Sequence, residues 1–244
     1  MTLEGWSKKY QEILVKFGYD KRKDIRSAKI LNSIVNDKST RDIGKKIIGR
    51  TVFVIGAGHS LGLAIPHLKK FKNTTKIVAD SAVSTILEKG IRPDIVVTDL
   101  DGDLDSLKKA SQYAIMVVHA HGDNMRNIPF AQLFKRHIGT TESESFGNIQ
   151  NYGGFTDGDR CVFLARHFDA KKIVLFGMDF DSKIGRFSDT KTSERKIKLK
   201  KLRMARSLLE WLASKNSAGL YTTSGHIAGF RKIRFADLQR LVRA

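Results

Sequence analysis

From about residue 50 onward, the chain alternates between short apolar runs and longer segments with helical periodicity. The apolar runs are rich in β-branched residues, and loops of glycine, aspartate, serine or histidine follow them. They span residues 51–55, 76–79, 94–97, 114–119, 137–140, 172–176 and, more briefly, 219–222. Strands that alternate with helices at this spacing predict βαβ units and a parallel sheet. Because the runs are continuously apolar, we expect helices to cover both faces of the sheet.

The first 48 residues follow a different pattern, with mixed charge and no β-branched runs. Helical periodicity is visible near residues 4–17 and 22–36. The sequence therefore predicts a helical N-terminal segment, 1–48, and an α/β catalytic domain, 49–244, with a Rossmann-like, mostly parallel sheet. Residues 181–194 are polar and lack periodicity, which predicts a loop that could close over a site.

Composition limits the kind of protein that the chain can form. Its 244 residues are 41% hydrophobic, enough for a substantial core. No apolar run approaches the roughly 20 residues that cross a bilayer, and the N-terminus does not resemble a signal peptide. Cys161 is the only cysteine in the sequence, so no internal disulfide can form, and we expect its thiol to be buried. We expect a cytoplasmic protein with no membrane partner.

The formal net charge of +19 makes anionic partners a natural expectation. The densest basic stretch, residues 195–206, continues with apolar residues to Leu212 and predicts a long amphipathic helix with a basic face. That face could be solvated, face phosphate groups or bind nucleic acid. Nucleic acid is not expected as a partner, because the sequence has no zinc-finger, RRM-type or KH-type motif.

Four aspartates occupy alternate positions just after the third apolar run. Asp99, Asp101, Asp103 and Asp105 would repel one another unless a cation lay among them, and Mg²⁺ prefers carboxylate oxygens. Helix capping accounts for Asp103 or Asp105 but not for the two aspartates at the strand end. We therefore predict that Asp99 and Asp101 bind Mg²⁺ and that the protein is a phosphate-handling enzyme.

The loop after the first run has the composition of a phosphate-binding turn. In parallel sheets, ligands bind beyond the carboxyl ends of the strands, so each such loop is a candidate. The stretch 56–62, GAGHSLG, predicts a turn that uses Gly56, Gly58 and Ser60. The alternative is a tight strand-to-helix turn in which Ser60 caps the helix. The sequence has no Walker A motif.

Two further loops carry polar side chains at expected strand or helix ends. The stretch 119–124, HAHGDN, lacks a third soft ligand at the spacing of a zinc site. We expect one of its histidines to contact phosphate or base, and Asp123 or Asn124 to cap the next helix or bind substrate. In the stretch 155–161, a helix cap at Thr156 or Asp157 competes with ligand binding, while Asp159 and Arg160 could both face the cleft. The candidate ligand-binding residues are Gly56, Gly58, Ser60, Asp80, His119, His121, Asn124, Thr156, Asp157, Arg160 and Asp179.

Taken together, these motifs resemble a known family. Residues 79–81 and 90–101 resemble the pattern of the thiamine pyrophosphokinases. The full set, 56–61, 97–102, 119–124, 154–160 and 177–180, is more similar to the archaeal 6-hydroxymethyl-7,8-dihydropterin diphosphokinases, the MptE-like family. The resemblance runs from about residue 50 to the C-terminus. His59 departs from it, at a position where proline is expected.

The resemblance implies an enzyme that transfers a diphosphoryl group from ATP to the hydroxymethyl group of a reduced pterin and releases AMP. It implies Mg²⁺, a thiamine-pyrophosphokinase-like fold and a role in tetrahydromethanopterin or folate-type biosynthesis. The catalytic set would be Asp99, Asp101, Asp123 and Asp159, with the metal on the first two. Asp80 could orient the metal shell, lysine or arginine of the basic helix could steady phosphate charge, and Asp179, Asn124 and Asn151 are candidates for binding the pterin ring.

Two alternatives remain open at this point. A nucleotide-sugar-dependent glycosyltransferase of a related family could use Asp99 and Asp101 as a metal-binding pair. A basic, non-catalytic nucleic-acid-binding protein could share the fold. The favoured partners are small molecules, ATP and a reduced pterin, and a homo-oligomer is compatible with the sequence.

Overall fold

The computed structural model describes residues 3–35, 39–180 and 195–243, and within them one sheet of nine parallel strands forms the centre of the protein. The strands are β1 (Thr51–Ile55), β2 (Thr75–Ala79), β3 (Ile95–Thr98), β4 (Ile115–Ala120), β5 (His137–Thr141), β6 (Ile149–Gln150), β7 (Lys172–Phe176), β8 (Leu220–Thr222) and β9 (Arg231–Lys232). Their order is β6-β5-β4-β3-β2-β1-β7-β8-β9. The predicted α/β class with a mostly parallel sheet is confirmed.

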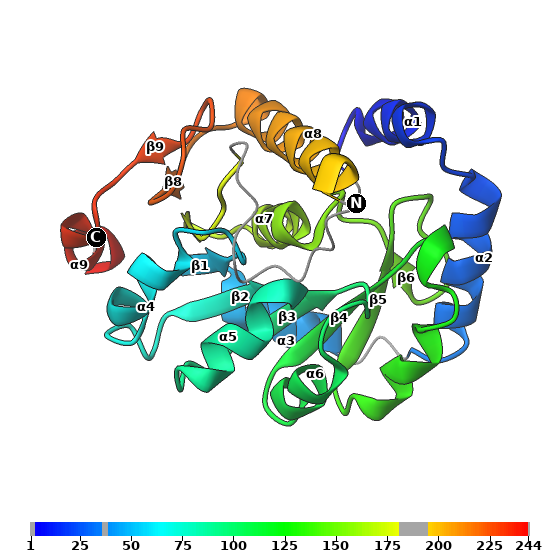
Figure 1. Cartoon of the computed structure of the whole chain (residues 1–244), viewed down its shortest axis with the longest axis horizontal. Coiled ribbons are helices and arrows are strands. Elements are labelled where there is room, and N and C mark those ends of the chain that lie inside the picture. Colours follow the sequence, from blue (N-terminus) through cyan, green and yellow to red (C-terminus); the bar gives the residue numbers. More distant parts are fainter. Residues whose placement is uncertain (1–2, 36–38, 181–194, 244) are drawn as a thin grey trace.

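Helices cover both faces of the sheet, as the continuously apolar strands require. One face packs against α4 (Leu61–Leu68), α5 (Val83–Glu88) and α6 (Leu104–Ser111). The other packs against α7 (Asp157–His167), which lies between the sheet and α8 (Arg195–Lys215) (Figure 1). Alternate residues of β1 feed the two cores: Val52 and Val54 pack on the α7 side, and Phe53 and Ile55 pack on the α4 side.

The N-terminal helices pack onto the sheet. They are α1 (Trp6–Phe17), α2 (Lys21–Asn32) and α3 (Thr40–Ile47), of which the periodicity of the sequence predicted the first two. Trp6 and Ile13 of α1 join the core on the α7 side, and Leu31 of α2 joins the other core. This segment therefore lies against the α/β unit and can supply residues to a site there.

The remaining elements are short. Strands β6 and β9 have two residues each, and α9 (Leu238–Arg243) closes the described chain. Two residues are too few to show periodicity, which is why the sequence did not reveal these strands. The basic helix, by contrast, was expected and is α8. Among the described residues, no helix combines the length and apolar character needed to cross a membrane.

Because all strands are parallel, the loops that leave their carboxyl ends gather at one edge of the sheet. The loops after β2, β3, β4 and β5 meet there with the N-terminus of α7. The order of the strands reverses between β1 and β7, so the loops after those two strands meet at the topological switch point. The polar residues predicted from the sequence fall into these two groups.

Candidate active site

Four aspartates come together where β2 and β3 end and α7 begins. In the described part of the chain, Asp80, Asp99, Asp101 and Asp157 each place one carboxylate oxygen within 4.8 Å of the others. Asp80 follows β2, Asp99 and Asp101 follow β3, and Asp157 is the first residue of α7. The sequence predicted the first three as metal ligands or neighbours of the metal. It offered Asp157 as a helix cap or ligand, and the structure places it in this group, which we call the aspartate cluster.

The aspartate cluster has unused coordination capacity. One oxygen each of Asp80, Asp99 and Asp157 is buried and has no hydrogen-bond partner among the described residues. Buried polar atoms are almost always partnered, so an unpartnered oxygen in each of three adjacent carboxylates is unusual. Carboxylate oxygens are the preferred ligands of Mg²⁺. The residues present therefore fit a hard divalent cation.

The backbone between the two central aspartates is held in an uncommon conformation. Leu100 has a φ of 67°, in the left-handed region that leucine rarely adopts. The hydroxyl of Thr98 accepts a hydrogen bond from Leu100 N–H at 2.8 Å and donates one to Asp80. Gly102 has no room for a side chain, because a Cβ there would collide with the Asp80 carboxylate. These contacts hold the aspartate cluster together from within.

Mutual repulsion shows in the protonation of the cluster. Burial, then the charges of Asp99 and Asp101, raises the pKa of Asp80 to about 7. Partial burial and the charge of Asp99 raise the pKa of Asp101 to about 7 as well. Burial alone would raise the pKa of Asp99, but hydrogen bonds from His121 and Asp101 outweigh it and lower that pKa. The cluster thus holds its negative charge at a cost that a cation would remove.

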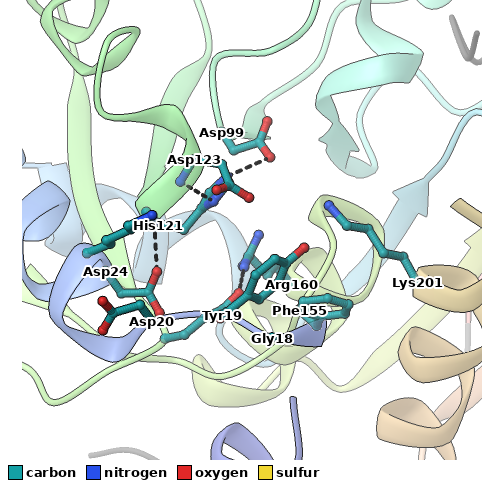
Figure 2. A pocket seen from close by; sticks show the side chains of 13 residues that line it. Gly18, Tyr19, Asp20, Asp24, Asp99, His121, Asp123, Phe155, Arg160 and Lys201 are labelled. Atoms are coloured by element: carbon teal, nitrogen blue, oxygen red, sulfur yellow. Dashed lines mark hydrogen bonds and ion pairs between the residues drawn. The ribbon is translucent and has the colours of Figure 1, made fainter. Parts of the chain in front are cut away.

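A pocket opens beside the cluster, and Asp99 belongs to both. The pocket offers about 90 Å³ to the centre of a water molecule, and one water needs roughly 10–15 Å³ on that scale. Figure 2 shows Lys201 reaching in from α8 on one side, and Asp20 and Asp24 on the other. The lining residues are Gly18, Tyr19, Asp20, Lys23, Asp24, Asp99, His121, Gly122, Asp123, Glu142, Phe155, Arg160 and Lys201.

Of the residues predicted from the sequence, three line this pocket together with Asp99: His121, Asp123 and Arg160. His121 Nε2 lies 3.3 Å from Oδ2 of Asp99. Arg160 lies 3.7 Å from Asp157 and forms a buried ion pair with Glu142. Asp123 is exposed at the rim. Its place is consistent with substrate contact, and its catalytic role stays a prediction.

One wall of the pocket was not expected from the sequence. The loop between α1 and α2 supplies Gly18, Tyr19 and Asp20, and α2 supplies Lys23 and Asp24. Asp24 accepts hydrogen bonds from Tyr10 (2.5 Å) and from Gly122 N–H (2.7 Å), which ties the N-terminal helices to the loop after β4. The polar turn at 18–20 was the one signal available, and only the fold brings it to the strand ends.

Lys201 is the residue of the basic helix that enters the pocket. Burial would lower the pKa of Lys201, but a hydrogen bond with Tyr19 and the charges of Asp99 and Asp123 outweigh it and raise that pKa. Its ammonium group lies 6.0 Å from the ring centres of Tyr19 and Phe155. Lys201 is therefore the candidate for the lysine of this helix that is predicted to stabilise phosphate charge.

The structure corrects the roles predicted around the start of α7. Asp159 is fully buried, and its two oxygens accept hydrogen bonds from Phe155 N–H (2.8 Å) and Thr156 N–H (2.7 Å). The Thr156 hydroxyl also donates to Asp159. These two residues form the capping box of the helix, so both Asp159 oxygens and the Thr156 hydroxyl are engaged at the helix start, which speaks against the predicted catalytic and ligand-binding roles.

Three other predicted ligand residues have their partners within the protein. The Asn124 amide donates to the carbonyls of Asp99 and His119, both at 2.7 Å, and accepts from His121 N–H. His119 is 1% exposed and contacts Thr140 rather than the pocket. Asn151 likewise holds the carbonyl of Glu142. In the 99–105 segment, Asp103 rather than Asp105 caps α6, accepting from Ser106 N–H at 3.1 Å.

The glycine-rich loop after β1 packs closely against the loop after β7. A Cβ on Gly58 would lie 2.6 Å from the carbonyl oxygen of Gly177 and would collide with Asp179. The Asp179 carboxylate accepts a hydrogen bond from Ser60 N–H at 2.8 Å, and the Ser60 hydroxyl lies 3.0 Å from that of Ser224. Gly56 is packed equally closely. Close packing accounts for these glycines, and the phosphate-binding role of the loop stays a prediction. The predicted lid, 181–194, lies outside the described residues.

Known proteins resemble this chain over most of its length. A model of the MptE-like family, described as 6-hydroxymethylpterin diphosphokinase MptE-like, matches residues 26–185. The chain belongs to the MptE-like family. Its relatives include 6-hydroxymethyl-7,8-dihydropterin pyrophosphokinases of Pyrococcus furiosus (44% identical, covering 89% of this chain and 97% of the relative) and Methanocaldococcus jannaschii (42%, 88% and 97%). The predicted family and its enzyme class, a diphosphotransferase, are confirmed.

A solved structure shares the fold of this MptE-like chain. The MAf glycosyltransferase from Magnetospirillum magneticum superposes with a TM-score of 0.58 at 15% identity. The match covers 89% of this chain and 42% of the glycosyltransferase. At this identity the likeness concerns the fold alone.

Proposed function

We propose that this chain transfers a diphosphoryl group from ATP to 6-hydroxymethyl-7,8-dihydropterin and releases AMP. The observation that carries the proposal is the aspartate cluster, with its unpartnered oxygens, at the edge of a pocket lined by aromatic and carboxylate side chains. The names of the relatives support the choice of acceptor. We further propose that the product enters tetrahydromethanopterin or folate-type biosynthesis.

The aspartate cluster would hold Mg²⁺, through Asp99 and Asp101 with Asp80 and Asp157 beside them. When bound, the metal neutralises the charge of the triphosphate and holds its oxygens. Without metal, four carboxylates would repel ATP. The basic side chains at this edge, Lys201 and Arg160, would add fixed positive charge near the transferred group.

The chemistry requires in-line transfer at the β-phosphorus of ATP. The pterin hydroxyl oxygen forms a bond to the β-phosphorus, and the bond from that phosphorus to the oxygen bridging it to the α-phosphorus breaks. AMP leaves with the bridging oxygen, and the hydroxyl proton passes to solvent or to a carboxylate. The protein's part is chiefly positioning and electrostatic stabilisation, since phosphoryl transfer demands little covalent chemistry of the enzyme.

The products test this proposal. The protein is incubated with ATP, Mg²⁺ and 6-hydroxymethyl-7,8-dihydropterin, and nucleotides and pterins are separated by chromatography. We expect AMP and pterin diphosphate in equal amounts, and neither when the pterin or Mg²⁺ is omitted. Formation of ADP with a pterin monophosphate, or the absence of turnover, would contradict the proposal. A nucleotide sugar offered as an alternative donor tests the glycosyltransferase hypothesis. That hypothesis has only the shared fold in its favour.

A further inference from the structure

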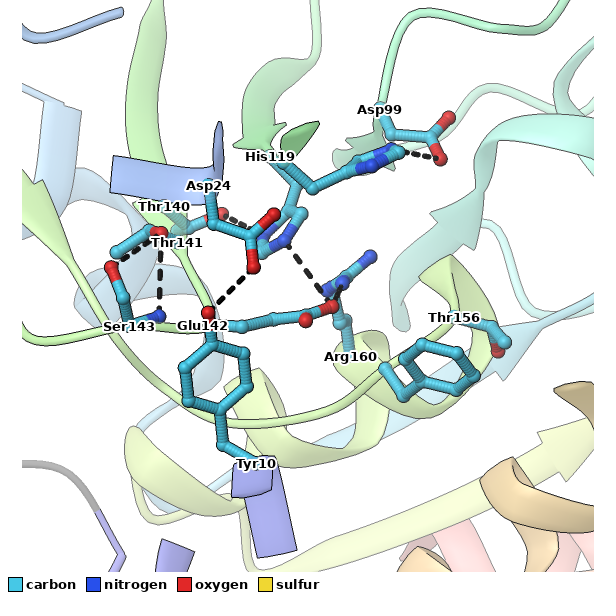
Figure 3. A network of polar contacts seen from close by, with 12 residues as sticks. Tyr10, Asp24, Asp99, His119, Thr140, Thr141, Glu142, Ser143, Thr156 and Arg160 are labelled. Carbon is cyan, nitrogen blue, oxygen red and sulfur yellow. Dashed lines mark hydrogen bonds and ion pairs between the residues drawn. The ribbon is translucent and has the colours of Figure 1, made fainter. Parts of the chain in front are cut away.

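One carboxylate in the pocket is buried yet not fully used. Glu142, just after β5, is 5% exposed. Its Oε1 forms the ion pair with Arg160 and lies 3.6 Å from His119 Nε2, while no donor among the described residues bonds to its Oε2 (Figure 3). Asp24, also buried in this pocket, differs because both its oxygens accept hydrogen bonds within the protein. Glu142 therefore retains an acceptor for a ligand.

The protein holds Glu142 firmly in place. Its carbonyl oxygen accepts hydrogen bonds from Trp6 Nε1 at 2.9 Å and from Asn151 Nδ2 at 2.8 Å. Trp6 is 2% exposed and belongs to α1, so the N-terminal helix is part of this support. Arg160 fixes the carboxylate itself. Side chains locked in this way recognise a ligand without first having to be ordered.

Two aromatic rings stand in the same pocket. The rings of Tyr19 and Phe155 are 6.4 Å apart at an interplanar angle of 46°. Both line the pocket together with Glu142. Rings of this kind pack against a face of a flat, conjugated ligand, and a free carboxylate oxygen accepts a hydrogen bond from an edge that carries an amino group and a ring N–H.

The position of Glu142 relative to the aspartate cluster gives the ligand a direction. The guanidinium of Arg160 bonds to Glu142 through Nη2 and lies 3.7 Å from Asp157 through Nη1, so one guanidinium group separates the two sites. A pterin carries its amino group and ring N–H at one end and its hydroxymethyl group at the other. Bound with the first end at Glu142, it can direct the second toward Asp99.

We infer that Glu142 determines acceptor specificity by binding the amino-bearing edge of the pterin, with Tyr19 and Phe155 packed against one face of the ring. The inference rests on the proposed function, because it names the acceptor subsite of that reaction. It replaces Asp179, Asn124 and Asn151 as the ring-binding residues. Asn124 and Asn151 are committed to backbone groups, and Asp179 binds Ser60 N–H.

Binding of the pterin alone tests the inference in the full-length protein, without ATP or Mg²⁺. Fluorescence titration measures the affinity for 6-hydroxymethylpterin and for the analogue with a 2-oxo group in place of the amino group. Wild type should bind the amino compound at least about 10-fold more tightly. Glu142→Gln should weaken that binding by about 10- to 100-fold, the range for losing a hydrogen bond to a charged group. It should also narrow or reverse the preference, since an amide can donate to the 2-oxo group.

Glu144→Gln is the matched control, because Glu144 lies two residues away with its side chain 93% exposed. It should bind both compounds as wild type does. If Glu142→Gln fails to fold, as judged by circular dichroism, Tyr19→Leu decides, with an expected loss of about 2- to 10-fold for a lost aromatic contact. Equal wild-type affinity for the two compounds, or unchanged binding in Tyr19→Leu and Glu142→Gln, would overturn the inference.

The outcomes separate this inference from the proposed function. A protein that binds the amino compound selectively but forms no AMP would refute the diphosphate transfer and leave the subsite standing. A protein that forms AMP and pterin diphosphate, with Glu142→Gln unchanged in its KM for the pterin, would refute the subsite alone. In the expected case, Glu142→Gln raises the KM for the pterin by a larger factor than the KM for ATP, since the acceptor loses a direct contact whereas ATP is affected only through the weakened Arg160–Glu142 pair.

Discussion

The two groups of loops at the carboxyl edge of the sheet use their polar residues in opposite ways. After β1 and β7, polar groups satisfy one another: Asp179 binds Ser60 N–H, and Gly58 N–H bonds to the Gly177 carbonyl at 2.7 Å. After β2 and β3, buried oxygens of Asp80 and Asp99 have no hydrogen-bond partner among the described residues. The general rule places ligands at the switch point between β1 and β7. Here the unused binding capacity lies one and two strands away.

The loops after β1 and β7 thus carry residues needed for packing, whereas the loops after β2 and β3 carry residues kept free for ligands. Substitutions in the loops after β1 and β7 should lower the free energy of unfolding. Substitutions in the aspartate cluster should lower turnover and leave the free energy of unfolding unchanged or higher. A cluster of unsatisfied carboxylates costs folding free energy, which is typical of sites shaped for function.

The largest effect is expected from Asp101→Asn. Removing one carboxylate from the proposed metal site should reduce kcat by about 100- to 1,000-fold, because transition-state charge is no longer neutralised. The melting temperature without metal should stay the same or rise, since like-charge repulsion is relieved. Asp105→Asn is the control, as the side chain of Asp105 is 94% exposed in the same segment. A large loss of stability in Asp101→Asn would instead mark a structural role.

The second-largest effect is expected from Asp157→Asn, which should lower the apparent Mg²⁺ affinity by about 10- to 100-fold. The measurement is the dependence of rate on Mg²⁺ concentration. Asp159→Asn, two residues further along, should leave the Mg²⁺ dependence unchanged. If the two variants behaved alike in this assay, the distinction between cluster residue and helix cap would be lost.

In the loop after β1, Gly58→Ala should lower the free energy of unfolding by about 1–3 kcal/mol, because the added Cβ would enter the space of Gly177 and Asp179. Chemical denaturation measures the change. Gly225→Ala serves as the comparison, since a Cβ there meets nothing within 4 Å. Equal stability of the two variants would mean that the glycine loop is looser than its contacts indicate.

A smaller change is expected in Asp159→Asn, whose free energy of unfolding should fall by about 0.5–2 kcal/mol as the capping box of α7 is weakened. Urea denaturation of the variant beside wild type measures it. A stability equal to that of wild type, together with lost turnover, would restore the catalytic role that the sequence predicted for this residue.

A further effect concerns pH. Asp80 and Asp101 have a pKa of about 7 when folded and an ordinary value near 4 when unfolded. The folded protein therefore holds protons that the unfolded chain releases, and metal-free stability should fall as pH rises from about 4 to about 7. Mg²⁺ competes with those protons, so the gain in melting temperature on adding Mg²⁺ should grow over the same interval. A gain independent of pH would place the metal elsewhere.

Much of this arrangement could be predicted from the sequence, for identifiable reasons. The buried strands read as continuous apolar runs, and Asp99 and Asp101 stood out because alternate carboxylates at a strand end have no simple structural purpose. The roles of Asp157 and Asp159 were not separable. They lie two positions apart at a helix start. Only the geometry of the first turn of α7 directs Asp157 into the aspartate cluster and Asp159 back onto the helix N-terminus.

Residues that reach the pocket only through tertiary contacts could not be predicted from the sequence. Tyr19 and Asp24 lie in a segment that reads as an ordinary pair of helices, and Glu142 follows a strand in a run of Ser, Thr and Glu. Nothing local distinguishes them. Their importance arises because α2 packs against β4 and β5, and because Trp6 of α1 donates a hydrogen bond to the Glu142 carbonyl. Similarly, Gly56 and Gly58 predicted a phosphate-binding turn. In the structure, glycine is needed at both positions because the loop after β7 packs too closely for a side chain.

Binding of Mn²⁺ in place of Mg²⁺, followed by electron paramagnetic resonance, shows whether the aspartate cluster is the metal site. Wild type and the Asp103→Asn/Asp105→Asn variant should bind Mn²⁺ alike, with affinity increased by ATP. The Asp99→Asn/Asp101→Asn variant should lose this binding while remaining folded. Equal binding by all three proteins would contradict the account.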